Sequence, residues 1–234
     1  KSDDDEVPFM KPVESQTLSL GYFYGQELGM LDIDFGVRLD QVSRDGTYNT
    51  TTHDISESDL STALTLGWNL ENNLGLSLGI SSVARAPSEL ELFMNGKHLV
   101  AARIERGNVN LESERSNNID FSLDYENDGY FLNASVYSNS VDSYIYLLDS
   151  GTKIDKLPVT NFTQADADFN GYEIEVGRSF ALNNGDFIIS YGRDEVVGTF
   201  SSGGNVPRIT PVKNIYSFAY SQQDITYDIK IKDI

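Results

Sequence analysis

The two histidines are the side chains of this 234-residue sequence best suited to hold a metal ion, because the sequence contains no cysteine. Imidazole is a good zinc ligand, and carboxylates can complete a tetrahedral shell around the ion. His98 lies in a polar segment that also carries Glu91 and Glu105, whereas His53 lies in a threonine-rich segment. We therefore take His98, Glu91, Glu105 and His53 as candidate metal ligands. The alternative for each histidine is a solvated position in a loop.

The remaining chemistry argues against an enzyme. The sequence contains neither an H-E-x-x-H pattern nor a phosphate-binding P-loop. Its 36 acidic residues are too many for any chosen carboxylate pair to be informative. The formal charge of −19 would repel nucleic acid, so we expect no nucleic-acid partner. We also expect no cofactor, and we interpret the acidic run at residues 3–6 as a solvated terminal loop.

Strands must position these residues, because apolar side chains recur at every second position. Leu74, Leu76, Leu78 and Ile80, for example, alternate with glycine and serine. Ten segments follow this pattern, at about residues 16–25, 31–40, 60–70, 74–81, 119–125, 130–146, 172–176, 187–193, 215–220 and 225–231. The fold class is therefore all-β.

The connections between the predicted strands alternate between short and long. The long ones lie at about 41–59, 82–114 and 149–168, and a Gly/Ser loop at 201–206 precedes Pro207 and Pro211. Outer-membrane barrels sort short turns to one end and long loops to the other. A transmembrane strand needs only about 9–11 residues, of which alternate ones are apolar. The pattern thus favours an antiparallel transmembrane β-barrel, with the apolar face toward lipid and the charged face toward a wet lumen. A soluble ligand-binding β-protein, with the apolar face inside, is the alternative.

Several motifs resemble the barrel signature of TonB-dependent outer-membrane receptors, in matching order and spacing. They are Arg85-Ala86-Pro87, Glu89-Leu90-Glu91-Leu92-Phe93, Gly96-Lys97-His98, Glu105-Arg106-Gly107-Asn108 and Glu114-Arg115-Ser116-Asn117-Asn118. The resemblance covers roughly residues 15–220. The Gly-Lys-His segment followed by Glu-x-Gly-Asn looks most like the zinc-uptake branch of the family.

The resemblance implies a barrel of about 22 strands with a plugged lumen, located in the bacterial outer membrane. Such receptors bind a scarce ligand from outside, here zinc or a metal chelate, and perform no chemical reaction. The TonB energy complex would act through the plug, and outer-membrane lipid would surround the barrel. Arg85 would then be a lumen-facing residue that contacts the plug, or it simply ends its strand before Pro87.

We interpret residues 1–234 as a partial barrel domain of about ten meander strands. A plug domain, a TonB-contacting segment and the family's closing strands are not recognisable in the sequence. A passive porin-like or structural outer-membrane barrel is a further alternative. The upstream sequence would separate the two, because a plug accompanies a receptor and not a porin.

Overall fold

A computed structural model describes residues 9–71, 73–182 and 185–234 of the chain. The acidic run at residues 3–6 therefore lies outside the described residues, as do parts of the turns at 71–73 and 183–186. No helix in the described ranges is long and apolar enough to cross a membrane.

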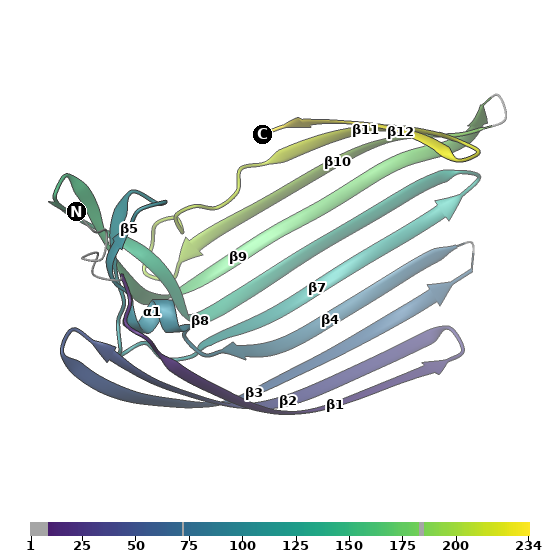
Figure 1. The fold of residues 1–234 in the computed structure, drawn as a ribbon. Coiled ribbons are helices and arrows are strands. Elements are labelled where there is room, and N and C mark those ends of the chain that lie inside the picture. The colour runs from purple at the N-terminus through teal and green to yellow at the C-terminus, as the bar shows by residue number, and fades with distance from the viewer. Residues whose placement is uncertain (1–8, 72, 183–184) are drawn as a thin grey trace.

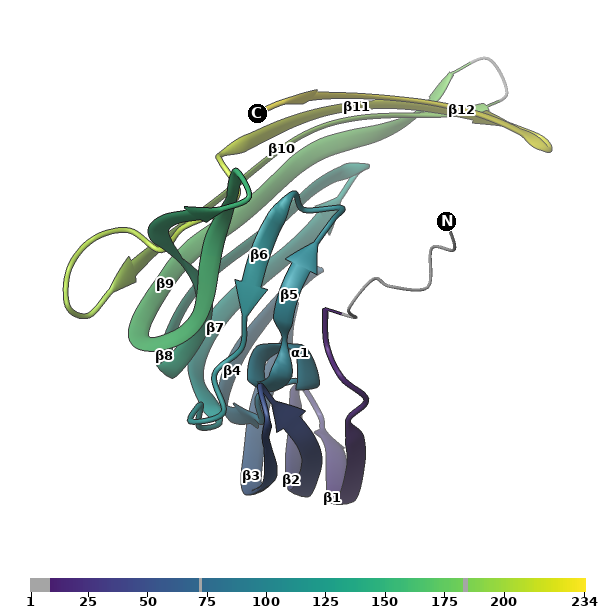
Figure 2. The same cartoon turned by 60° about the vertical axis from the view of Figure 1, so that its left-hand side comes forward.

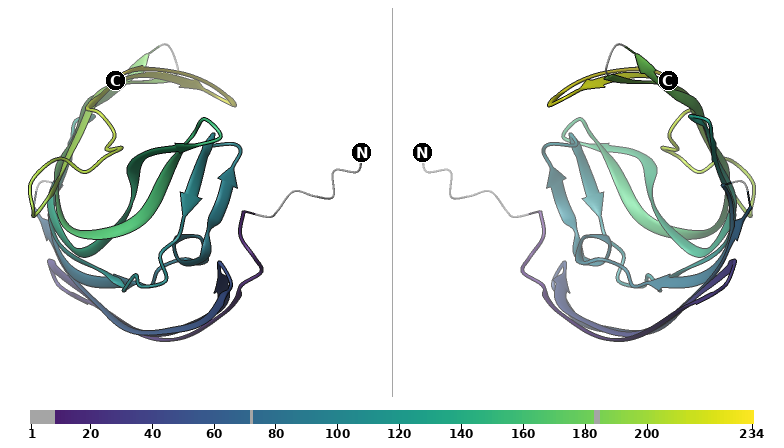
Figure 3. Two further views of the ribbon diagram at one scale, coloured as in Figure 1. Left: turned by 90° about the vertical axis from the view of Figure 1, so that its left-hand side faces the viewer. Right: turned by 90° about the vertical axis from the view of Figure 1, so that its right-hand side faces the viewer.

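Ten strands form one antiparallel meander, in which each strand pairs with the next along the chain (Figure 1). They are β1 (Glu14–Leu28), β2 (Leu31–Tyr48), β3 (Thr51–Leu70), β4 (Leu74–Arg85), β7 (Glu114–Asn127), β8 (Tyr130–Ile154), β9 (Leu157–Leu182), β10 (Gly185–Phe200), β11 (Lys213–Gln222) and β12 (Ile225–Asp233). The sheet bends into an open, C-shaped wall around a hollow (Figure 3). The predicted all-β barrel segment is confirmed, including the number of meander strands.

Three short elements lie inside the hollow: the helix α1 (Glu89–Phe93) and the strands β5 (Asn95–His98) and β6 (Arg103–Arg106) (Figure 3). Arg44 of β2 forms a 3.2 Å ion pair with Glu89 of this inner helix. Even-numbered residues of β2 therefore face the hollow, which we call the lumen face. The odd-numbered residues, among them Leu31 and Phe35, lie on the opposite, outer face.

The outer face carries the apolar side chains, as predicted. Phe35 on β2 and Leu64 on β3 are paired in register and are 39% and 36% exposed. Side chains packed into a sealed interior would be nearly inaccessible. The lumen face of the same strands carries Asp32, Asp34 and Arg38 instead.

The predicted polar loops at 41–59 and 149–168 are wrong, because strands continue through them. The β2–β3 pairing runs without interruption to Tyr48 opposite Thr51, and β8 and β9 pair as far as Ile154 opposite Leu157. Along these extensions the outer face changes from apolar to polar, for example from Leu39 to Gln41 on β2. Backbone hydrogen bonds between strands do not require apolar side chains. The strands therefore extend beyond the residues that show hydrophobic alternation.

The small core of the chain lies where the inner elements meet the wall. Leu92, Phe93, Leu111 and Ile145 are fully or nearly fully buried and pack together. Ser88 starts α1 with a capping box, in which its side chain accepts from the backbone of Glu91 and the Glu91 side chain accepts from the Ser88 backbone. Five helical residues are too few to be stable alone, so this packing and capping hold α1 in place.

Gly46→Ala is expected to loosen α1, because a Cβ at Gly46 would lie 2.9 Å from the ring of Phe93. Overpacking of this kind costs about 1–3 kcal/mol. Hydrogen exchange of residues 89–93 measures the effect. Gly36→Ala is the matched control on the same strand and face, because its nearest neighbour is a Phe23 ring atom at 3.9 Å. Equal exchange in both variants would contradict the close approach.

Candidate functional site at the mouth of the hollow

The β5–β6 hairpin carries His98 across the hollow, near the end where the long connections gather (Figures 2 and 3). One edge of the hairpin pairs with the wall, through parallel pairing of β6 with β9 from Ile104 opposite Val159 to Arg106 opposite Asn161. At the other edge the backbone N–H of Asn95 donates to the carbonyl of Phe9 at 2.8 Å. The hairpin is thus held on both sides.

The β5–β6 hairpin brings His98 and Glu105 together. His98 Nδ1 lies 3.1 Å from Glu105 Oε1, and the Phe9 ring stacks beside the imidazole at a centroid distance of 6.2 Å. Arg103 Nε donates to the same carboxylate oxygen of Glu105 at 2.5 Å. The Glu105 side chain is 5% exposed and the His98 side chain is 41% exposed.

This geometry assigns different roles to the two residues. A carboxylate can only accept a hydrogen bond, so His98 Nδ1 must carry the proton. The lone pair of the neutral ring then lies on Nε2, which is free to bind a ligand. Glu105 binds both Arg103 and His98 through Oε1 and is suited to orient the imidazole, in the way that carboxylates commonly support metal-bound histidines.

Glu91 lies on α1 and is engaged elsewhere. Arg85 donates to its two carboxylate oxygens at 2.8 and 3.1 Å, and the backbone N–H of Ser88 donates at 2.7 Å. Burial alone would raise the pKa of Glu91, but these hydrogen bonds outweigh it and hold that pKa below its ordinary value. Arg85 also donates to Glu114 at 2.6 Å, so its guanidinium ties β4, α1 and β7 together. A plug contact by Arg85 stays a prediction.

His53 lies on β3 opposite Gly46, on the lumen face of the extended β2–β3 hairpin. Across the described ranges, no group of three or more His, Asp and Glu side chains is placed to hold a metal ion. The four candidates therefore separate into the His98–Glu105 pair, the ion-paired Glu91 and the isolated His53.

Two residues at this site were missed by the sequence analysis. Arg103 stands two positions before Glu105, so strand periodicity could have placed both on one face of β6. Phe9 had no such signal, because its contact with His98 joins segments that are distant in the sequence.

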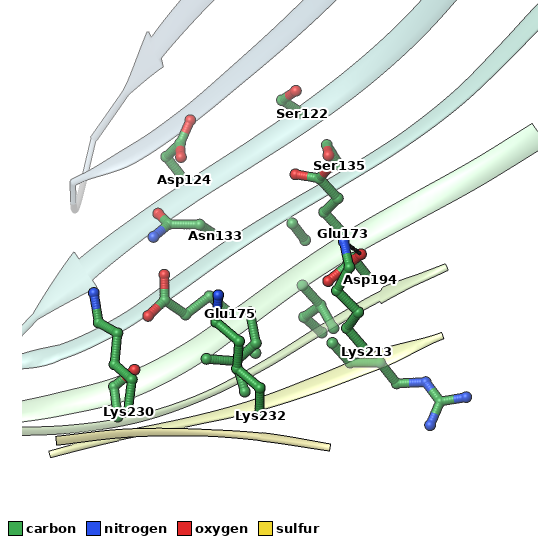
Figure 4. Close-up of a pocket in the computed structure, with 16 residues that line it drawn as sticks. Ser122, Asp124, Asn133, Ser135, Glu173, Glu175, Asp194, Lys213, Lys230 and Lys232 are labelled. Carbon is green, nitrogen blue, oxygen red and sulfur yellow. Dashed lines mark hydrogen bonds and ion pairs between the residues drawn. The ribbon is translucent and has the colours of Figure 1, made fainter. Parts of the chain in front are cut away.

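Farther along the hollow, the lumen face is charged as predicted. A depression of about 670 Å³ opens on β7–β12, and its polar side chains point toward one another in Figure 4. Figure 4 labels the acidic residues Asp124, Glu173, Glu175 and Asp194 and the basic residues Lys213, Lys230 and Lys232. Glu173 and Asp194 stand directly opposite each other, and Lys213 relieves their repulsion with a 3.2 Å ion pair to Asp194.

One short match to a hydrolase motif, G-x-S-x-G, occurs at residues 75–79. The chemistry of that motif needs a sharp turn from a strand into a helix, which exposes the serine. Here all five residues lie within β4, and Ser77 pairs with Gly67 and Ser122 of the neighbouring strands. The match is an ordinary strand alternation.

Solved structures with the same fold include the copper transporter OprC, with a TM-score of 0.75 at 20% identity over 97% of this chain and 35% of that chain. The FrpB iron transporter from Neisseria meningitidis (F5-1 variant) has a TM-score of 0.66 at 15% identity, covering 95% of this chain and 34% of that chain. The ferripyoverdine receptor of the outer membrane of Pseudomonas aeruginosa has a TM-score of 0.62 at 12% identity, covering 94% and 28%. This chain spans roughly a third of the length of these structures.

A sequence model of the family described as "TonB dependent receptor-like, beta-barrel" matches residues 6–229, which is nearly the whole chain. The family and the structural neighbours are transport receptors and not enzymes. The resemblance seen in the sequence is therefore confirmed for the family, while the zinc-uptake branch stays a prediction. This chain belongs to the β-barrel family of TonB-dependent receptors.

Proposed function

We propose that the chain is the mouth-bearing barrel segment of an outer-membrane receptor that takes up zinc. His98 is the proposed metal ligand, through Nε2, and Glu105 orients it. The remaining ligands would come from other parts of the receptor, as would the plug through which the TonB complex acts. The observation that carries this proposal is the half-exposed imidazole with its Nδ1 fixed by a buried carboxylate.

The inner elements favour a receptor over a passive porin. α1 and the β5–β6 hairpin occupy the hollow and are fixed to the wall by the β6–β9 pairing and by the Arg85 ion pairs. An open channel for diffusion would gain nothing from a rigid obstruction. A receptor needs one, because a preorganised surface at the mouth lowers the entropy cost of ligand binding.

A metal chelate is the second candidate ligand. The described residues offer His98 as a single free imidazole beside Glu105, and a chelate brings its own metal ligands. Arg103 and His98 would then contact the chelator. The proteins of similar fold include both a copper transporter and a ferripyoverdine receptor.

In the complete receptor, His98→Ala is expected to weaken zinc binding by at least about tenfold, because the proposed ligand atom is lost. Glu105→Gln should weaken it by a smaller factor, because the amide still accepts from Nδ1. Isothermal titration calorimetry with zinc chloride measures both, and His53→Ala is the matched histidine control. Unchanged zinc affinity in His98→Ala would contradict the zinc proposal. Tight binding of a ferric chelate by a receptor that ignores free zinc would favour the second candidate.

A further inference from the structure

Arg178 is a charged side chain on the outer face of the wall. Glu173 and Glu175 of β9 line the lumen depression, so the even-numbered residues of this strand point outward. The outward neighbours of Arg178 are aromatic or aliphatic, namely Tyr130 and Ile189 in register with it and Val176 and Phe180 along β9. A guanidinium surrounded by apolar side chains is energetically costly unless it forms hydrogen bonds or an ion pair.

The position of Arg178 fixes its depth. It pairs with Tyr130, the first residue of β8, which directly follows the tight turn at Asp128 and Gly129. Short turns mark the periplasmic end of outer-membrane barrels. Arg178 therefore lies at the short-turn rim of the apolar band, where lipid headgroups meet the protein.

The guanidinium lies close to two aromatic rings. Its Cζ atom lies 4.4 Å from the centroid of Tyr130 and 5.8 Å from that of Phe180. Phe180 is itself braced by Phe187 in an edge contact at 5.1 Å. Cation–π contacts of this kind restrict the position of an arginine and leave its N–H groups free to donate.

No carboxylate among the described residues lies within ion-pair distance of Arg178, although the chain carries 36 of them. Arg193, also on the outer face, differs in this respect. It donates to Tyr172 at 2.8 Å, and its guanidinium lies 3.5 Å from Glu195. Arg193 thus has polar partners within the protein, whereas the N–H groups of Arg178 have no carboxylate partner among the described residues.

We propose that Arg178, stacked on Tyr130 and Phe180, binds the phosphate of a membrane phospholipid at the short-turn rim of the barrel. A phosphodiester accepts two parallel N–H bonds from a guanidinium, and the N–H groups of Arg178 have no carboxylate partner among the described residues. The acyl chains would lie along the apolar outer face, next to Val176 and Ile189. This site is separate from the mouth and does not depend on the identity of the transported ligand.

The test uses the complete receptor purified in dodecyl maltoside, which contains no phosphate, and native mass spectrometry with added phosphatidylglycerol. Wild type is expected to retain a phosphatidylglycerol molecule that Arg178→Gln binds about tenfold more weakly, the size of one lost charged hydrogen bond. Arg193→Gln is the matched control and should retain the lipid like wild type. Diacylglycerol, which has the acyl chains without the phosphate, should not be retained.

If Arg178→Gln fails to fold, the thermal unfolding of wild type and of Tyr130→Leu provides a second test of the proposal. In wild type, phosphatidylglycerol should raise the thermal unfolding temperature in maltoside, whereas diacylglycerol should not. Tyr130→Leu, which removes the stacking platform, should reduce that rise. Equal lipid retention by wild type and Arg178→Gln, or equal stabilisation by the two lipids, would overturn the proposal.

Discussion

Leu78→Arg is expected to lower the free energy of unfolding of the complete receptor in a phospholipid bilayer by about 2–4 kcal/mol, the cost of an arginine near the middle of the lipid-facing band of a barrel. Leu78 lies on the outer face of β4, between Leu66 of β3 and Phe121 of β7. Guanidinium titration of the receptor in large unilamellar vesicles measures the change, with the mobility shift of the folded barrel in electrophoresis as the readout.

Ser77→Arg is the matched control, one residue away on the same strand. Ser77 has the same parity as Arg85, whose side chain reaches α1 inside the hollow, so it faces the lumen. An arginine there meets water and the acidic side chains of the lumen face, and we expect a change below about 1 kcal/mol. Equal destabilisation by the two substitutions would contradict the assignment of the two faces.

Arg85→Met is expected to release α1 from the wall. Methionine keeps much of the length of the side chain, but Glu91 and Glu114 lose their shared cation while they are only 14% and 12% exposed. Loss of such charged hydrogen bonds costs about 1.5–3 kcal/mol. Hydrogen exchange should rise in residues 89–106 and stay unchanged in β10–β12. Arg38→Met is the control, because the Arg38–Asp40 pair lies on β2 and touches no inner element. Protection of α1 equal to wild type would contradict the role of Arg85.

The Arg85–Glu91 contact also gives the mouth a defined pH dependence. The pKa of Glu91 is lower in the folded chain than its ordinary value of 4.5. A lowered pKa adds stability that is complete above about pH 4.5 and is lost as the pH falls through the folded value. Hydrogen exchange of α1, corrected for intrinsic rates, should therefore be constant from neutral pH to about pH 5 and should rise only below pH 4.5. In Arg85→Met, Glu91 loses the cation that helps to lower its pKa, so α1 has less stability to lose on acidification and the rise in exchange below pH 4.5 should be smaller than in wild type. Identical profiles would contradict this coupling.

The sequence predicted the wall because a sheet with one apolar face repeats every two residues. Leu31 to Leu39 and Leu60 to Leu70 show that period, and they form the outer-face portions of β2 and β3. The alternation of short and long connections likewise predicted the meander, because each tight turn forces the next strand to pair with the last.

The same reasoning failed where the outer face becomes polar. Residues 41–59 hold strand structure through ladder hydrogen bonds and through lumen-face contacts, as when Ile55 packs against the inner core. Neither leaves a hydrophobic alternation to detect. The inner elements were missed for a related reason, because α1 and the β5–β6 hairpin are short and depend on contacts with distant residues.

The candidate metal site stays a prediction, and the structure adds the contact between His98 and Glu105. His98 and Glu105 were identified by residue type, and the hairpin register that brings them together was not predictable from spacing alone. Glu91 was grouped with them because carboxylates are natural metal ligands. Its actual partner is Arg85, which the sequence suggested as a plug contact. The ion pair between Glu91 and Arg85 depends on how α1 packs against β4, which the sequence pattern did not show.

The account rests on the outer face of this wall meeting hydrocarbon, and single-cysteine labelling along β3 tests that most directly. This chain contributes no cysteine of its own, so labelling within it is confined to the introduced residue. Nitroxide labels at positions 60–70, in the complete receptor reconstituted in phospholipid, should show high collision rates with oxygen at even positions, such as Leu64 and Leu66. The rates should be low at odd positions, such as Thr65 and Gly67. Oxygen collision rates that do not alternate, or that peak at the odd positions, would contradict the account.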